Sequence, residues 1–119
     1  RVRKAFPDKL IFAGFDEMLL PATVLGVDGA IGSTYNVNGL RAKQIFELAR
    51  NSKIAEALEI QHTTNDLIEG ILSNGLYQTI KEILKLEGVD AGYCRKPMKR
   101  ISQEQVEFAK ELHNKFFKN

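Results

Sequence analysis

Apolar and polar positions divide the chain into two short strand-like runs followed by helices. Residues 10–13 are apolar without alternation, which is typical of a strand buried on both faces. Residues 27–31 form a second short run that is rich in glycine. The intervening residues 16–25 suffice for one helix, with acidic residues in its first turn and Gly26 at its end. The pattern therefore predicts a parallel strand–helix–strand unit.

The remainder of the chain carries helical periodicity. Ala42, Ile45 and Ala49 recur at the spacing of one helix face, whereas residues 33–39 before them are polar and predict a connection. The last predicted helix opens at Ser102, with a glutamine three residues later in the spacing of a capping box. The predicted helices cover 40–50, 54–72 with a polar interruption at 61–66, 76–86, and the segment after Ser102.

Two parallel strands alone do not make a stable sheet, because both edges stay unpaired and little surface is covered. The strands are expected to pair with more of the same protein or with another copy of the chain. Residues 1–6 read as the last turns of a helix that stops before Pro7, and no methionine precedes them. We therefore expect the chain to be part of a longer enzyme.

Composition narrows the class of protein. In 119 residues, 44% are hydrophobic, which is enough for one packed domain, and the 17 basic and 15 acidic residues are interspersed. The densest basic run, residues 95–100, suits a solvated loop better than a phosphate or nucleic-acid patch. Because the charges form no concentrated basic face, no nucleic-acid partner is expected. Cys94 alone can form no internal disulfide or metal cluster, and no apolar run approaches the roughly 18 residues of a membrane span. A cytoplasmic setting is expected by default.

Polar residues follow both predicted strands. Asp16 and Glu17 place two carboxylates after Gly14, whose missing side chain lets a ligand approach the backbone. Ionised carboxylates are pure acceptors and suit hydroxyl groups, but Asp16 could equally cap the following helix. Ser33, after Gly32, would lie at the same edge of the sheet as Asp16 and Glu17, and it could hydrogen-bond a ligand or its own turn.

The other candidates are weaker. Tyr77 opens a predicted helix and suits a core position or a site, His62 belongs on a helix surface, and His113 is expected to face solvent. None of the lysines lies where an enclosed site would lower its pKa, as an amine nucleophile requires. The sequence has no serine elbow, phosphate-binding loop or zinc spacing, so the chain alone carries no complete catalytic centre.

Three motifs resemble one enzyme family. Residues 14–17, 26–38 and 91–97 closely resemble the C-terminal part of the bacterial N-acetylneuraminate lyases, the sialic acid aldolases of the dihydrodipicolinate synthase superfamily. The resemblance implies an α/β fold: the last two strands of a (β/α)8 TIM barrel followed by a helical C-terminal extension. It further implies that residues 1–51 are the last β/α units, that 52–119 are the extension, and that the complete enzyme is a homotetramer.

The resemblance also implies an activity. These enzymes cleave N-acetylneuraminate reversibly to N-acetylmannosamine and pyruvate through a Schiff base on a barrel lysine, without a cofactor. Residues matching the family's sugar-tail positions are Gly14, Asp16, Glu17 and Ser33, with Gly32 shaping the same wall and Tyr77 at the edge of the site. The family's lysine, catalytic tyrosine and pyruvate loop have no counterpart here, so the implied partner is the N-terminal part of the same barrel.

Two alternatives stay open at this point. One is a related pyruvate-dependent aldolase or a dihydrodipicolinate synthase-like enzyme that acts on a different keto acid. The other is a non-catalytic barrel fragment whose strands pair between copies of the chain.

Overall fold

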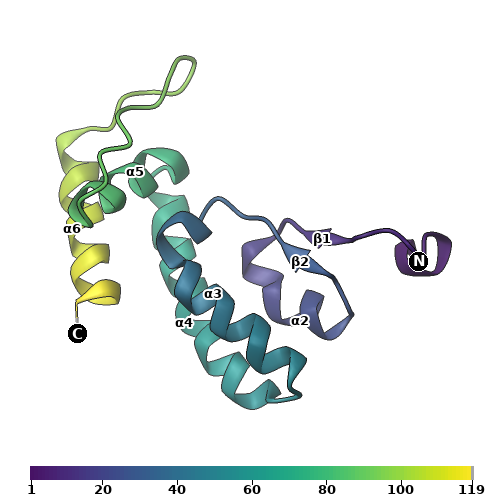
Figure 1. Cartoon of the computed structure of the whole chain (residues 1–119). Helices are drawn as coiled ribbons and strands as arrows, with labels where there is room; N and C mark the ends of the chain where they lie inside the picture. The colour runs from purple at the N-terminus through teal and green to yellow at the C-terminus, as the bar shows by residue number, and fades with distance from the viewer. Residues whose placement is uncertain (119) are drawn as a thin grey trace. The chain divides into compact units, whose positions relative to one another are not determined.

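The computed structural model describes residues 1–118, and their contacts form two compact units, residues 1–64 and residues from 65 onward. The elements of the chain, shown in Figure 1, are α1 (Val2–Ala5), β1 (Phe12–Ala13), the 3-10 helix η1 (Asp16–Met18), α2 (Leu19–Val24), β2 (Gly29–Ala30), α3 (Tyr35–Arg50), α4 (Ile54–Ser73), α5 (Leu76–Leu86) and α6 (Gln103–Phe117).

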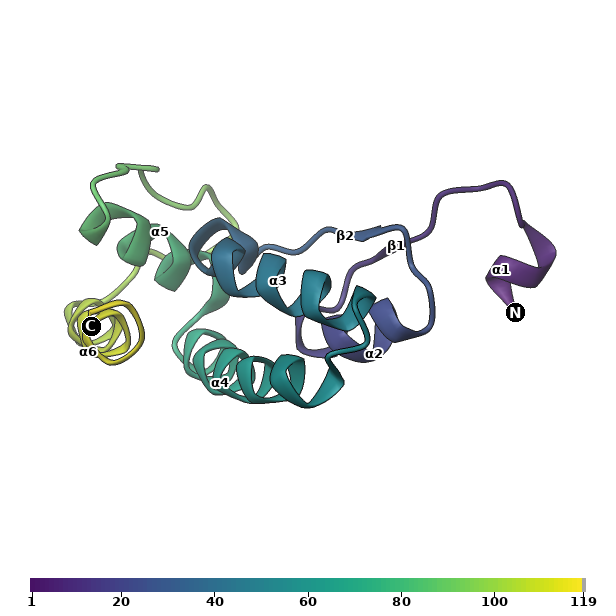
Figure 2. The same cartoon turned by 60° about the horizontal axis from the view of Figure 1, so that its bottom comes forward.

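The first unit contains the predicted strand–helix–strand arrangement. β1 and β2 are parallel, with Phe12 opposite Gly29, and they lie side by side in Figure 2. The amide of Ile31 donates to the carbonyl of Ala13 at 2.8 Å, which extends the pairing beyond the two formal strand residues. Gly26 has a φ of 88° and ends the intervening helix as predicted, because glycine adopts this conformation without strain.

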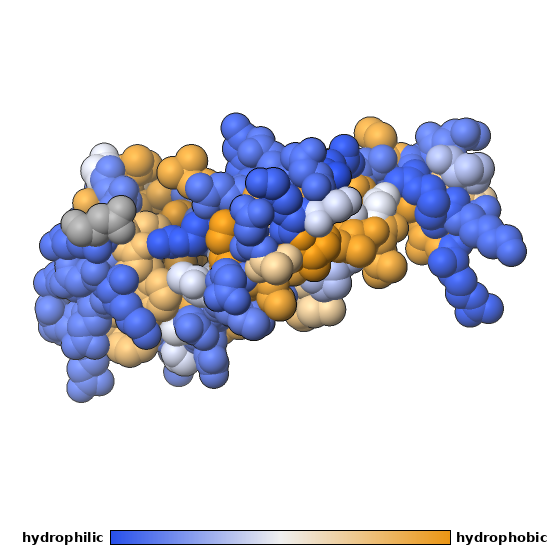
Figure 3. Space-filling view, turned by 90° about the horizontal axis from the view of Figure 1, so that it is seen from below, coloured by the Kyte–Doolittle hydropathy of each residue, from blue (hydrophilic) through white to orange (hydrophobic). Residues whose placement is uncertain are grey.

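The prediction that the first strand is buried on both faces is wrong for this structure. Leu10 is 72% exposed and Phe12 52% exposed, and Ile31 beyond β2 is 70% exposed. The cause is a lack of cover, since β2 is the only strand that pairs with β1 among residues 1–118. Figure 3 shows apolar surface between hydrophilic patches on one face of the molecule. Leu25, which follows α2, is 84% exposed.

The core of the first unit lies between α2, α3 and the start of α4. The predicted helix face on α3 is confirmed, because its apolar residues at three- and four-residue spacing are buried. The cluster consists of Leu19, Leu20, Ala42, Ile45, Ala49 and Ala57.

The polar connection predicted for residues 33–39 is mostly helix. α3 begins at Tyr35, and only Asn38 departs from helical geometry, with φ −115° and ψ 18°. The Asn38 side chain is buried; its Nδ2 donates to Thr64 Oγ1 at 3.3 Å and its Oδ1 accepts from Arg41 Nη1 at 3.0 Å. These contacts satisfy a buried amide and hold the kink, which hydrophobic periodicity cannot reveal.

The second unit matches the sequence prediction closely. α5 has the predicted bounds, and Gly88 follows it with a φ of 88°. α6 begins with the predicted capping box, in which Ser102 Oγ accepts from the Gln105 amide at 3.2 Å and Gln105 Oε1 accepts from the Ser102 amide at 3.0 Å. Asn74, just before α5, links α5 to α6, because its Nδ2 donates both to Thr79 Oγ1 of α5 at 3.1 Å and to the Gln105 carbonyl of α6 at 2.9 Å.

The prediction that His113 faces solvent is wrong. His113 is 7% exposed, lies one turn after the buried Ala109 on α6, and stacks on Phe117 with ring centroids 5.5 Å apart. Its Nε2 contacts a carboxylate oxygen of Glu87, so a polar partner from the end of α5 accompanies the buried ring. His62 lies on the exposed surface of α4, as predicted.

Candidate functional site

Asp16 and Thr34 meet at the carboxyl ends of the two strands. Asp16 is 6% exposed, and its Oδ2 accepts hydrogen bonds from the Thr34 amide at 3.1 Å and from the Thr34 hydroxyl. The alternative in which Asp16 caps its own helix is wrong, because Phe15 rather than Asp16 is the N-cap of η1 and the Asp16 carboxylate accepts its hydrogen bonds from Thr34. Asp16 instead joins the end of the first strand segment to the start of α3.

Gly32 makes this carboxylate position possible. A Cβ atom on Gly32 would lie 1.7 Å from Asp16 Oδ1, a distance that no side chain tolerates. Gly14 differs, since a Cβ there would meet only the Ile31 carbonyl at 3.9 Å, an ordinary contact. The packing of this chain therefore requires glycine at position 32 but not at position 14.

Gln61 holds the backbone of the same turn. Its Nε2 donates to the Asp16 carbonyl at 3.3 Å, and its Oε1 accepts from the Leu20 amide at 2.9 Å. Gln61 is 3% exposed and lies four residues after the buried Ala57 on α4. Residues 61–66 interrupt the apolar pattern of α4, and the four-residue spacing from Ala57 is the one sequence signal for this role of Gln61.

Tyr35 lies close enough to the acidic pair to be affected by its charge. Burial first, and then the charges of Asp16 and Glu17, raise the pKa of the Tyr35 phenol well above its ordinary value of 10.0. Within residues 1–118 the buried hydroxyl has no hydrogen-bond partner. Tyr35 also lines an open, mostly apolar hollow of about 200 Å³ beside Ala30 and Phe46. A phenol with this pKa stays protonated at neutral pH and can donate a hydrogen bond.

The remaining predicted residues are placed as follows. Ser33 and Glu17 are both half-buried, directly after Gly32 and Asp16 respectively. The Ser33 carbonyl accepts from Asn36 Nδ2 at 2.8 Å, so its turn is held through the backbone. Tyr77 lies in the second unit, 47% exposed at the start of α5, and its place at the site stays a prediction.

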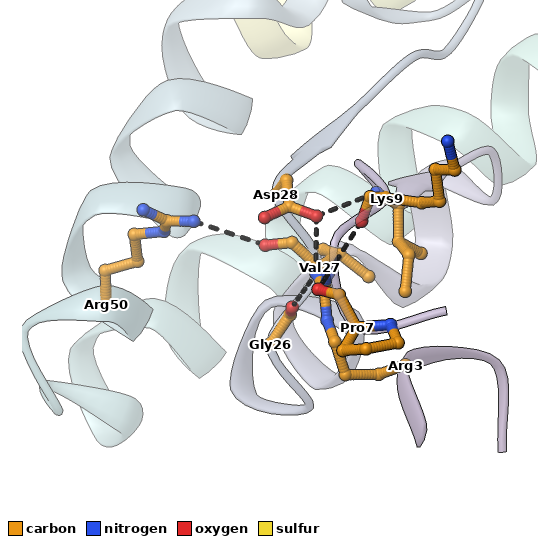
Figure 4. A network of polar contacts seen from close by, with 8 residues as sticks. Arg3, Pro7, Lys9, Gly26, Val27, Asp28 and Arg50 are labelled. Atoms are coloured by element: carbon orange, nitrogen blue, oxygen red, sulfur yellow. Dashed lines mark hydrogen bonds and ion pairs between the residues drawn. The ribbon is translucent and has the colours of Figure 1, made fainter. Parts of the chain in front are cut away.

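A polar network holds the opposite, amino ends of the strands (Figure 4). Arg3 donates to the Lys9 carbonyl at 2.7 Å and pairs with the Asp28 carboxylate, which also accepts from the Ile11 amide at 2.7 Å. Arg50 donates to the Val27 carbonyl at 3.3 Å on the same side. These contacts hold the amino ends of the strands, opposite the carboxyl ends at which the candidate site lies.

Asp28 gives this network a pH dependence. The Ile11 amide, and then the Arg3 guanidinium, hold the pKa of Asp28 below its usual 3.8. Because the folded-state pKa is lowered, the stabilisation is complete above about pH 5 and is lost as pH falls through the folded value. We expect Asp28→Asn to lower the thermal midpoint at pH 7, with the difference from wild type shrinking below about pH 4. Melting curves against pH test this, with the exposed Asp8→Asn as control; a difference that stays constant with pH would contradict it.

The other chemistry considered at the sequence level is not assembled in the described part of the chain. Across residues 1–118, no three or more His, Cys, Asp or Glu side chains are grouped to hold a metal ion. No described helix is long and apolar enough to cross a membrane. The basic run at 95–100 is exposed and lacks helix or strand, and Cys94 beside it is a free, half-buried thiol.

Known proteins resemble the whole chain. It is 92% identical over 119 residues to the N-acetylneuraminate lyase of Fusobacterium nucleatum subsp. nucleatum, and it spans 41% of the length of that protein. The crystal structure of the Fusobacterium nucleatum lyase complexed with pyruvate matches 99% of this chain with a TM-score of 0.95. This chain covers 40% of the chain in that structure.

A structure of CdNal from Clostridium difficile in complex with mannosamine matches 98% of the chain at 70% identity and a TM-score of 0.96, and the chain covers 40% of it. The resemblance to N-acetylneuraminate lyases is therefore confirmed. The model of the dihydrodipicolinate synthetase family matches residues 1–115. This match covers nearly the whole chain, which therefore belongs to the dihydrodipicolinate synthetase family.

Proposed function

We propose that this chain forms the sugar-recognising wall of an N-acetylneuraminate lyase. The observation that carries the proposal is the acidic turn at the carboxyl ends of two parallel strands, where barrel enzymes of this architecture place their sites. Residues 10–14 and 27–32 would be the seventh and eighth barrel strands, and the later helices the C-terminal extension. The complete enzyme would be a cytoplasmic homotetramer.

The wall serves substrate binding rather than bond cleavage. N-acetylneuraminate carries several tail hydroxyls, and each needs a hydrogen-bond partner when it leaves water. Glu17, Ser33 and the backbone at Gly14 would supply acceptors at one edge, and Asp16 is buried. A lysine outside this chain would form the Schiff base with the keto carbon and release water, and cleavage would then free N-acetylmannosamine.

The proposal is tested with a hybrid barrel, defined here as the Fusobacterium nucleatum lyase with its matching segment replaced by this chain. We expect the hybrid barrel to cleave N-acetylneuraminate and to prefer it to a shorter keto acid such as 2-keto-3-deoxygluconate. Borohydride should trap pyruvate on it as a stable adduct. Preference for the shorter keto acid would favour a related aldolase and contradict the proposal.

Self-association is a second possibility for the isolated chain. The exposed Leu10, Phe12 and Ile31 leave apolar surface around the two strands, which unpaired edges would join to another copy. Native mass spectrometry of the 119-residue chain separates the two cases. A chain that gains aldolase activity on addition of the remaining barrel supports the proposed function, whereas a self-associated species that stays inactive after that addition supports the second possibility.

A further inference from the structure

The contact between Asp16 and Thr34 points to a residue that the sequence analysis did not single out. We propose that Thr34 is a positioning residue for sugar binding, which fixes the Asp16 carboxylate so that Oδ1 faces the Gly32 wall. The inference rests on the proposed function, because it concerns how the Asp16 carboxylate of that site is held.

The geometry makes Thr34 the main determinant of the carboxylate orientation. Thr34 is 3% exposed, and both its amide and its hydroxyl donate to the same oxygen, Asp16 Oδ2. Two donors on one oxygen fix the rotation of the carboxylate plane and leave Oδ1 as the oxygen that Thr34 does not engage. Gly32 is the only residue type that leaves room for this arrangement, since any Cβ would overlap Oδ1.

The backbone of the turn is held separately. Gln61 bonds the Asp16 carbonyl and the Leu20 amide, so loss of the Thr34 hydroxyl would leave the carboxylate held by the Thr34 amide alone without freeing the turn. A buried carboxylate that loses a donor must find another partner or take up water. The adjoining Glu17 would then face a less ordered neighbour, and recognition of the sugar tail would weaken.

The test replaces the hydroxyl in the hybrid barrel. We expect Thr34→Val to raise KM for N-acetylneuraminate by up to roughly tenfold, because one of the two donors that orient the Asp16 carboxylate is lost, with kcat and pyruvate trapping unchanged. Thr34→Ser keeps the donor and should restore KM. Thr34→Ala lacks the hydroxyl but adds no bulk, so it should show the same rise in KM if the valine variant does not fold.

Thr23→Val is the matched control. Thr23 is also buried, at 6% exposed, and its hydroxyl bonds only the Leu19 carbonyl within α2 at 2.7 Å, so the KM of this variant should stay at the wild-type value. In an Asp16→Asn background, Thr34→Val should add little further loss, because Thr34 acts through that carboxylate.

Three results would overturn the inference: wild-type KM in Thr34→Ala, equal losses in sugar binding and pyruvate trapping, or additive losses with Asp16→Asn. The proposed function fails by a different result, namely that the unsubstituted hybrid barrel does not cleave N-acetylneuraminate.

Discussion

Glu17→Gln in the hybrid barrel is expected to raise KM for N-acetylneuraminate by roughly 10- to 100-fold, while pyruvate trapping stays at the wild-type level. Glu17 is half-buried at the strand ends, directly after the buried Asp16. A hydrogen bond to a charged acceptor contributes about 1.5–3 kcal/mol, which corresponds to this range. The glutamine side chain keeps the shape but loses the charge.

Steady-state kinetics and borohydride trapping measure the two effects separately. Glu47→Gln is the control, because Glu47 is exposed on α3 and pairs only loosely with Lys43, at 3.7 Å. If Glu17→Gln failed to form the pyruvate adduct, the assignment of Glu17 to the sugar tail would be wrong.

Gly32→Ala is expected to cause the largest structural loss of any single methyl addition at the site. The new Cβ would lie 1.7 Å from Asp16 Oδ1, and that carboxylate is buried and held by Thr34. Overpacking of this kind costs about 1–3 kcal/mol, and displacement of the bound carboxylate adds the loss of its hydrogen bonds. We therefore expect a lower thermal midpoint together with weaker sugar binding.

Gly39→Ala provides the matched comparison. Gly39 lies in α3 with nothing within 4 Å of an added Cβ, and alanine in a helix is favoured over glycine by roughly 0.5–1 kcal/mol. Thermal unfolding of both variants should therefore move in opposite directions. A Gly32→Ala protein as stable as wild type would show that Asp16 does not occupy this position.

Local features of the fold were predictable because their causes are close in sequence. The bounds of α5, the capping box at Ser102 and the stop at Gly26 all follow from residues within a few positions of one another. The burial of the strands was not predictable, since it depends on what covers them. His113 was misjudged because only the fold brings Glu87 to it.

The candidate site was predictable in its residues but not in its arrangement. Polar residues after each apolar run identified Asp16, Glu17 and Ser33, and the family resemblance supplied their proposed roles. Thr34 contacts Asp16 across 18 residues, and Gln61 contacts Asp16 across 45 residues. No local pattern encodes such pairs. The same applies to the requirement for glycine at position 32, which arises from a side chain 16 positions earlier.

The most direct measurement is a crystal structure of the hybrid barrel with an open-chain analogue of N-acetylneuraminate. We expect the tail hydroxyls to lie about 3 Å from Glu17 and Ser33, with the Asp16 carboxylate still bound by Thr34. An analogue whose tail contacts other elements of the barrel, leaving the edge formed by residues 14–34 without ligand, would contradict the assignment of this chain to sugar recognition.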